Sequence, residues 1–177
     1  MPIVFGQQAN SVEEILSVFR EHGDRVRDTY RARYVWTRAA ENPYSAGTTL
    51  ERPRCLRDNP AEVVFPWEQV FLAAATCAGS DYPMLAGHLG LPLDRVELVV
   101  EGLFDPRGEF SGLGGYAAPA DAAPSYLSLH LRAVLDSPAP RHQLEAIHDR
   151  VLAQNMVLGA LRGIPRTSQL VVRRATS

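Results

Sequence analysis

A long helical segment in the middle of the chain, residues 66–90, constrains the fold more than any other stretch. Its sequence is PWEQVFLAAATCAGSDYPMLAGHLG. Pro66 suits the first position of a helix and Gly90 suits its end. Pro83 removes one hydrogen bond of the helix ladder and clashes with the preceding turn. We therefore expect a long helix that is kinked or broken between Gly79 and Pro83.

Segments with a two-residue alternation surround this helix. In residues 29–38, Tyr34 and Trp36 alternate with Arg31 and Arg33, which is typical of a half-buried strand. Similar patterns predict further strands over residues 48–57, 94–105, 125–135 and 168–174, and helices over residues 12–22, 139–154 and 156–162. Strands separated by two large helices favour an α+β layered fold.

Length and composition limit the class of protein. The chain has 177 residues, the size of one domain, so we expect a single domain over residues 1–177 with residues 1–24 as an N-terminal helical extension. Its net charge of -2 gives no basic footprint for nucleic acid. No apolar run approaches the roughly 20 residues of a membrane span, and no signal peptide is evident. We therefore expect a cytoplasmic protein that binds neither nucleic acid nor membrane.

All 18 basic residues are arginines, because the chain contains no lysine. This excludes Schiff-base chemistry and a Walker A phosphate loop, since both need a lysine amine. Cys55 and Cys77 are the only cysteines. Two thiols in a reducing compartment are more often free or catalytic than joined in a structural bridge.

Four stretches of the sequence, taken in order, resemble the OsmC/Ohr family. Residues 66–77, PWEQVFLAAATC, are similar to the family's Pro-x-Glu-x-x-Leu-x-Ala-x-x-x-Cys helix start. LGLPLD at residues 89–94, FDPRG at residues 104–108 and DSPAP at residues 136–140 follow in the family's order. The resemblance covers residues 29–174. It implies an OsmC-like α+β fold with an antiparallel-rich sheet, two long helices and an intertwined homodimer.

The resemblance also implies a chemistry. Cys77 stands where the family keeps the cysteine that attacks peroxide, and an Arg and a Glu prepare its thiolate. Glu68 and Arg38 are the candidates for these two residues, with Arg33 as the rival for the arginine. The implied function is a thiol-dependent peroxidase that reduces organic hydroperoxides, without a metal or other cofactor. Its partners would be a second copy of the chain, a small apolar hydroperoxide and an external thiol reductant.

Three positions depart from the family's pattern. Asn155 occupies the place of the resolving cysteine, so an external thiol must complete the cycle. Trp67 follows the proline where the most active branch has its Glu, and Glu68 comes one place later. Asp81 lies four residues after Cys77, and a carboxylate on the same helical face repels an anionic sulfur.

These departures keep other readings open. The chain could be a non-peroxidatic OsmC-like dimer that binds a small apolar ligand at the dimer interface. It could also be a different enzyme on the same scaffold, with Asp81 or His88 as acid or base. A helix cysteine among alanines, such as Cys77, is by itself usually a packing residue, and Cys55 is explained as a half-buried inert thiol. The E-x-x-H pair Glu145 and His148 lacks the second pair that a di-iron bundle needs and is interpreted as surface.

Overall fold

The computed structural model describes residues 3–39, 42–43, 46–62 and 64–174. Its main sheet has five strands in the order β4-β3-β5-β6-β7. All neighbours are antiparallel except β6 and β7, which are parallel. The strands are β3 (Asp28–Thr37), β4 (Gly47–Glu51), β5 (Arg95–Phe104), β6 (Tyr126–Asp136) and β7 (Arg166–Arg173). A two-residue pair, β1 (Ile3–Val4) and β2 (Gln7–Gln8), forms a separate ribbon.

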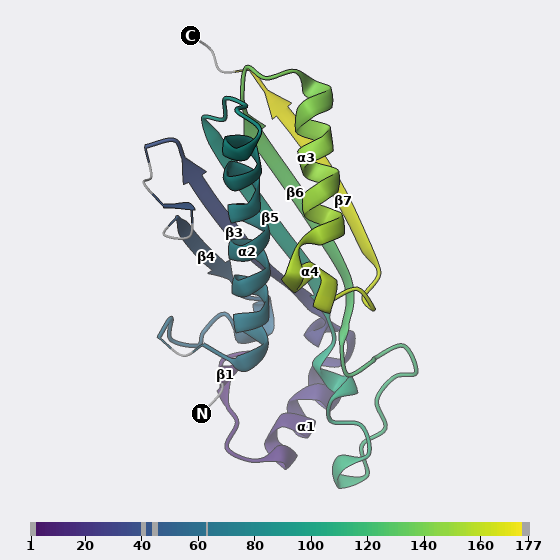
Figure 1. Ribbon diagram of the computed structural model, residues 1–177. Helices are drawn as coiled ribbons and strands as arrows, with labels where there is room; N and C mark the ends of the chain where they lie inside the picture. The colour runs from purple at the N-terminus through teal and green to yellow at the C-terminus, as the bar shows by residue number, and fades with distance from the viewer. Residues whose placement is uncertain (1–2, 40–41, 44–45, 63, 175–177) are drawn as a thin grey trace.

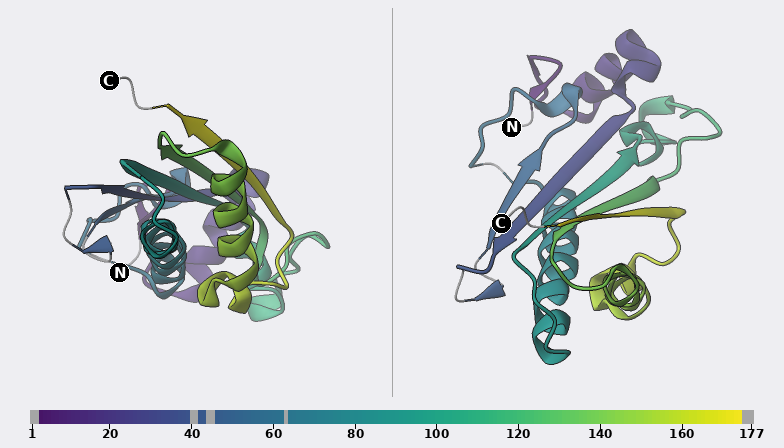
Figure 2. Two further views of the ribbon diagram at one scale, coloured as in Figure 1. Left: turned by 45° about the horizontal axis from the view of Figure 1, so that its top comes forward. Right: turned by 90° about the horizontal axis from the view of Figure 1, so that it is seen from above.

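Two long helices cover one face of this sheet. α2 (Pro66–His88) and α3 (Arg141–Gln154) lie side by side on the same side of the strands (Figures 1 and 2). The short α4 (Met156–Ala160) follows α3 directly, and its chain then returns as β7. The α+β class predicted from the sequence is confirmed. Among the described residues, no helix has the length and apolar character that crossing a membrane requires.

The main core lies between the sheet and the two helices. Alternate side chains of the central strands are buried there, including Tyr34, Leu98 and Leu131. Their neighbours along the strands face the other side, where Arg33 forms an ion pair with Glu97 at 2.9 Å. This division follows from the two-residue period of a strand, which sends successive side chains to opposite faces.

The N-terminal helix α1 (Val12–His22) builds a second, smaller core beyond one end of the sheet (Figure 1). Ser11 and Glu14 form the capping box that starts it, because each side chain accepts a hydrogen bond from the other residue's backbone N–H. Leu16 and Phe19 pack with Val26 and with aromatic side chains of the loop between β5 and β6. The extension is therefore anchored to that loop.

The predicted break in the long helix is wrong. α2 runs without interruption from Pro66 to His88, with Pro83 inside it. Gly79 and Pro83 are both buried, so packing along the helix outweighs the loss of the single hydrogen bond that proline cannot donate. Ser80 does not cap a second helix. Its hydroxyl instead donates to the backbone carbonyl of Cys77 at 2.9 Å.

Two other local predictions also need correction. β4 ends at Glu51 instead of residue 57, and Cys55 lies in a 3-10 turn, Arg54–Leu56. The reason is Pro53, which has no backbone N–H for a strand ladder. His148 is not on the surface: it is 6% exposed, and its Nδ1 lies 2.7 Å from the hydroxyl of Tyr82.

A close contact in the core gives a stability prediction. A methyl group on Gly79 would come within 2.3 Å of the Tyr34 ring, whereas one on Gly87 would meet nothing within 4 Å. Both glycines lie in α2, so alanine brings both the same helix-propensity gain of up to ~1 kcal/mol. We expect Gly87→Ala to be stabilising and Gly79→Ala to destabilise by about 1–3 kcal/mol through overpacking. Urea denaturation measures both, and equal stability of the two variants would contradict this packing.

Candidate functional site

Cys77 lies in the middle of α2, beside Asn155, the N-cap residue of α4. Its sulfur accepts a hydrogen bond from Nδ2 of Asn155 at 3.2 Å, and the same amide donates to Oδ2 of Asp81 at 2.7 Å. Asn155 is itself fixed, because its Oδ1 accepts the backbone N–H of Leu158 at 3.0 Å and caps α4. The thiol is a free cysteine and only partly buried. A fixed N–H donor therefore points at an accessible sulfur.

The two neighbours of this thiol act in opposite directions. An N–H donor stabilises a sulfur that carries negative charge. The carboxylate of Asp81 accepts a hydrogen bond from the same amide, and its negative charge repels a negatively charged sulfur at Cys77. No arginine forms a hydrogen bond or ion pair with Cys77 among the described residues. The amide of Asn155 is therefore the hydrogen-bond donor that the described chain places at this sulfur.

Glu68 lies at the start of α2 and is fully buried. Its two oxygens accept hydrogen bonds from Arg52, at 2.6 Å from Nε and 3.1 Å from Nη2. Oε2 also accepts the backbone N–H of Phe65 at 2.8 Å, which caps the helix. Arg52 donates further to the carbonyls of Asn59 and Pro60, both at 2.8 Å. This bidentate pair joins the strand β4, the following loop and the helix start.

The Arg52–Glu68 pair and Cys77 occupy different levels of α2. Nine residues separate Glu68 from Cys77, which is about 13 Å along a helix axis and half a turn out of phase around it. The contacts with β4 agree, because the hydroxyl of Thr48 lies 2.9 Å from that of Thr76 while Arg52 reaches Glu68. The structure therefore does not bring Glu68 to Cys77 within this chain.

The two arginines expected from the sequence have other partners. Arg38 forms an ion pair with Asp94 at 2.9 Å and donates to the carbonyl of Leu93 at 3.2 Å. It is four residues beyond Tyr34, whose ring lies beside Gly79, so it sits roughly 13 Å further on, just past the end of β3. Arg33 pairs with Glu97 on the face of the sheet opposite the helices. A role for Arg38 at the thiol stays a prediction.

Cys55 lies in a different environment from Cys77. It is 2% exposed, and its thiol faces the carbonyl of Val26 at 3.7 Å. Burial raises the pKa of the Cys55 thiol to about 12. Both cysteines are free, and Cys55 lies near the start of α2 instead of its middle. The structure forms no disulfide between these two cysteines.

The comparisons with known proteins point to one fold. No protein-family model and no curated protein matches the sequence. An OsmC-like hydroperoxide resistance protein from Jannaschia sp. CCS1 matches with a TM-score of 0.56 at 12% identity, over 77% of this chain and 87% of its own. The chain has an OsmC-like fold.

Two further solved structures are similar to this OsmC-like chain. A hypothetical protein from Aquifex aeolicus VF5 has a TM-score of 0.50 at 10% identity, with 80% of this chain and 96% of that chain covered. An OsmC-like protein from Mycoplasma pneumoniae has a TM-score of 0.46 at 15% identity, with 77% and 95% covered.

The sequence did not predict the contacts that two residues, Asn155 and Arg52, make with the candidate residues Cys77 and Glu68. Asn155 was noted for the cysteine it replaces, yet it also donates to Cys77. Its place directly before a predicted helix was a usable signal, because Asn is a favoured N-cap. Arg52, the partner of Glu68, carries no such signal: it stands 16 residues before Glu68, and only the fold brings the two together.

Proposed function

We propose that this protein is a slow, one-cysteine peroxidase that reduces organic hydroperoxides through Cys77 and an external thiol. The observation that supports it is the hydrogen bond from Asn155 to the partly exposed sulfur. The OsmC-like fold adds to this support, because a solved structure with the same fold is described as a hydroperoxide resistance protein.

The reaction follows from the chemistry of a thiolate. The anionic sulfur of Cys77 attacks the distal peroxide oxygen, the O–O bond breaks, and the alkoxide leaves and takes a proton to become an alcohol. Cys77 is then a sulfenic acid. An external thiol condenses with it, releasing water and forming a mixed disulfide. A second thiol regenerates Cys77 and leaves as a disulfide, so one hydroperoxide and two thiols give one alcohol, one water and one disulfide.

Two features make this reaction slow and dependent on an outside reductant. Asp81 shares the amide of Asn155 with the sulfur, and its carboxylate repels the anion that must attack. Asn155 lies beside Cys77 at the position that resembles the resolving cysteine, and an amide cannot form a disulfide. Cys55 cannot substitute for it, because it is buried near the start of α2, away from Cys77 in the middle of the helix.

The stoichiometry of peroxide consumption tests this proposal. Without added thiol, we expect at most one equivalent of an organic hydroperoxide to be consumed per chain, because the sulfenic acid has no partner. With a small dithiol, we expect many turnovers. Peroxide assay after mixing measures both, and mass spectrometry locates the oxidised cysteine. Several rapid turnovers in the absence of any thiol would contradict the one-cysteine mechanism.

We further propose that the chain forms a homodimer across the face that carries Cys77. Tyr34 and Trp36 of β3 are buried within the same chain, so this strand does not need a partner chain to cover them. Support comes instead from the outer side of the helices, where Ala73 and Met156 are exposed, Met156 to 80%. Light scattering is expected to show the mass of a dimer, whose interface should bury over ~2,000 Å² as obligate dimers do. A monomer at micromolar concentration would refute it.

A further inference from the structure

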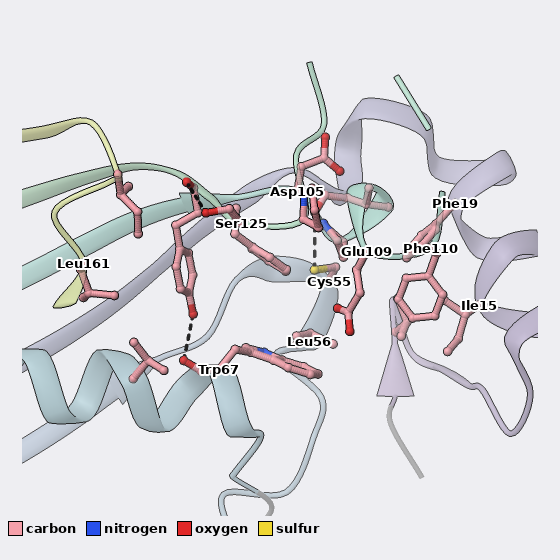
Figure 3. A pocket seen from close by; sticks show the side chains of 18 residues that line it. Ile15, Phe19, Cys55, Leu56, Trp67, Asp105, Glu109, Phe110, Ser125 and Leu161 are labelled. Atoms are coloured by element: carbon pink, nitrogen blue, oxygen red, sulfur yellow. Dashed lines mark hydrogen bonds between the residues drawn. The ribbon is translucent and has the colours of Figure 1, made fainter. Parts of the chain in front are cut away.

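A large apolar cavity lies at the end of the molecule where the N-terminal extension meets the start of α2. Its volume is about 520 Å³, within the range of ~300–1,000 Å³ typical of small-molecule sites. Ile15 and Phe19 of α1, Trp67 of α2, Phe110 of the loop after β5 and Leu161 after α4 contribute to its wall (Figure 3). Four separate segments therefore converge on one apolar space.

The cavity is separate from the site at Cys77. Val70 is the lining residue furthest along α2, and it precedes Cys77 by seven residues, or about 10 Å of helix. The gap next to Val70, lined by Phe71 and Ala74, is too narrow to admit a water molecule. A molecule in the cavity is therefore not positioned to react with the thiol.

Two carboxylates line this cavity, and they differ in their partners. Asp105 has no exposed side-chain surface, and its oxygens accept hydrogen bonds from Arg107 at 2.9 and 2.8 Å and from Arg27 at 3.2 and 3.1 Å. Burial opposes its ionisation, yet these arginines keep the pKa of Asp105 below its usual value. Its charge is thus balanced inside the protein.

Glu109 is the second carboxylate. It is exposed at the cavity and extends from the turn after β5 towards the space near Leu56 and Phe110 (Figure 3). Within the described ranges of the chain, no hydrogen bond or ion pair to its side chain is found. None of the described lining residues is an arginine or a histidine, and the sequence has no lysine. The cavity therefore presents one unbalanced negative charge beside an apolar wall.

We propose that this cavity binds a small molecule with an apolar body and a cationic head, of the alkylammonium or arylalkylammonium class. The apolar body fills the space between Trp67 and Phe110, and the ammonium group lies at Glu109. An anionic amphiphile such as a fatty acid is disfavoured, because its carboxylate would meet Glu109 with no cation in the wall to offset the repulsion. This site does not depend on the proposed chemistry of Cys77.

Three ligands with one apolar body and different heads test the proposal. Isothermal titration of the full chain with phenylhexylamine, phenylhexanol and phenylhexanoate at neutral pH should give saturable binding, tightest for the amine and weakest for the carboxylate. Glu109→Gln should weaken the amine about fivefold, the scale of a partly exposed ion pair, and leave the alcohol unchanged. Cys77→Ser should bind all three like the wild type, which separates this site from the peroxidase.

A filling variant and a matched control locate the binding. Val70→Trp places a large ring into the cavity and should weaken amine and alcohol tenfold or more. Gln69→Trp adds the same ring on the exposed side of the same helix and should change neither. The proposal is overturned if phenylhexanoate binds as tightly as the amine, or if Glu109→Gln and Val70→Trp leave the amine unaffected. It is also overturned if none of the three ligands shows saturable binding. That holds even if light scattering shows a dimer in which a second copy of the chain would cover the cavity.

Discussion

Cys77→Ser is expected to abolish hydroperoxide consumption, both the single equivalent without thiol and the turnover with a dithiol. Serine keeps the size and the hydrogen bond from Asn155 but has no nucleophilic sulfur. Cys55→Ser should consume peroxide at the wild-type rate, because burial raises the pKa of Cys55 to about 12. At pH 7 only about one part in 10⁵ of that thiol is ionised, and the thiolate is the nucleophile.

Stopped-flow mixing of each variant with an organic hydroperoxide measures these rates. Circular dichroism and thermal unfolding of Cys77→Ser should match the wild type, so that a lost reaction is not a lost fold. Full activity of Cys77→Ser would show that the sulfur of Cys77 takes no part in the reaction. A loss confined to Cys55→Ser would move the chemistry to the buried thiol.

The sheet could be predicted from the sequence because each strand carries its own two-residue period. Tyr34 and Trp36 alternate with arginines, and the structure buries the two aromatic rings while the arginines face the other side. The end of β4 was harder to place. Apolar residues continue past Glu51, and only the missing N–H of Pro53 ends the strand. Cys55 then lies buried in the 3-10 turn that follows.

The long helix shows where local rules fail. Pro83 predicts a break by its own chemistry, but the fold buries it together with Gly79 and keeps α2 whole. Gly79 also allows the Tyr34 ring to approach the helix, a contact between segments 45 residues apart in the sequence. No sequence pattern within α2 predicts that contact.

The catalytic roles of Cys77, Glu68 and Arg38 stay predictions, and the structure adds which contacts each of them makes. Cys77 could be singled out from a resemblance, and the position of Asn155 was matched to the second cysteine, which the structure indeed places beside the sulfur. The chosen charged residues are instead spread along α2, with Glu68 at its start and Arg38 near its end. Which arginine meets Glu68 depends on how β4 packs along α2, because Arg52 directly follows that strand.

The pair that holds the start of α2 gives the largest expected loss of stability. Arg52→Met leaves the carboxylate of Glu68, which has no exposed surface, without its cation. Removing one partner of a buried ion pair costs about 3–5 kcal/mol, a large share of the ~5–15 kcal/mol that stabilises a typical domain. The matched control is Arg38→Met, whose pair with Asp94 is 60% and 36% exposed. That variant should lose at most ~1 kcal/mol.

The double variant Arg52→Met with Glu68→Met should recover part of the loss, because no charge then stays buried without a partner. Urea denaturation measures the free energy of unfolding of the wild type, of the single variants Arg52→Met and Arg38→Met, and of the double variant. Equal losses for Arg52→Met and Arg38→Met would show that the pair at the helix start is not desolvated. Peroxide consumption by the folded double variant then decides whether Glu68 acts on Cys77, as the sequence resemblance implies, or only fixes the helix that carries it.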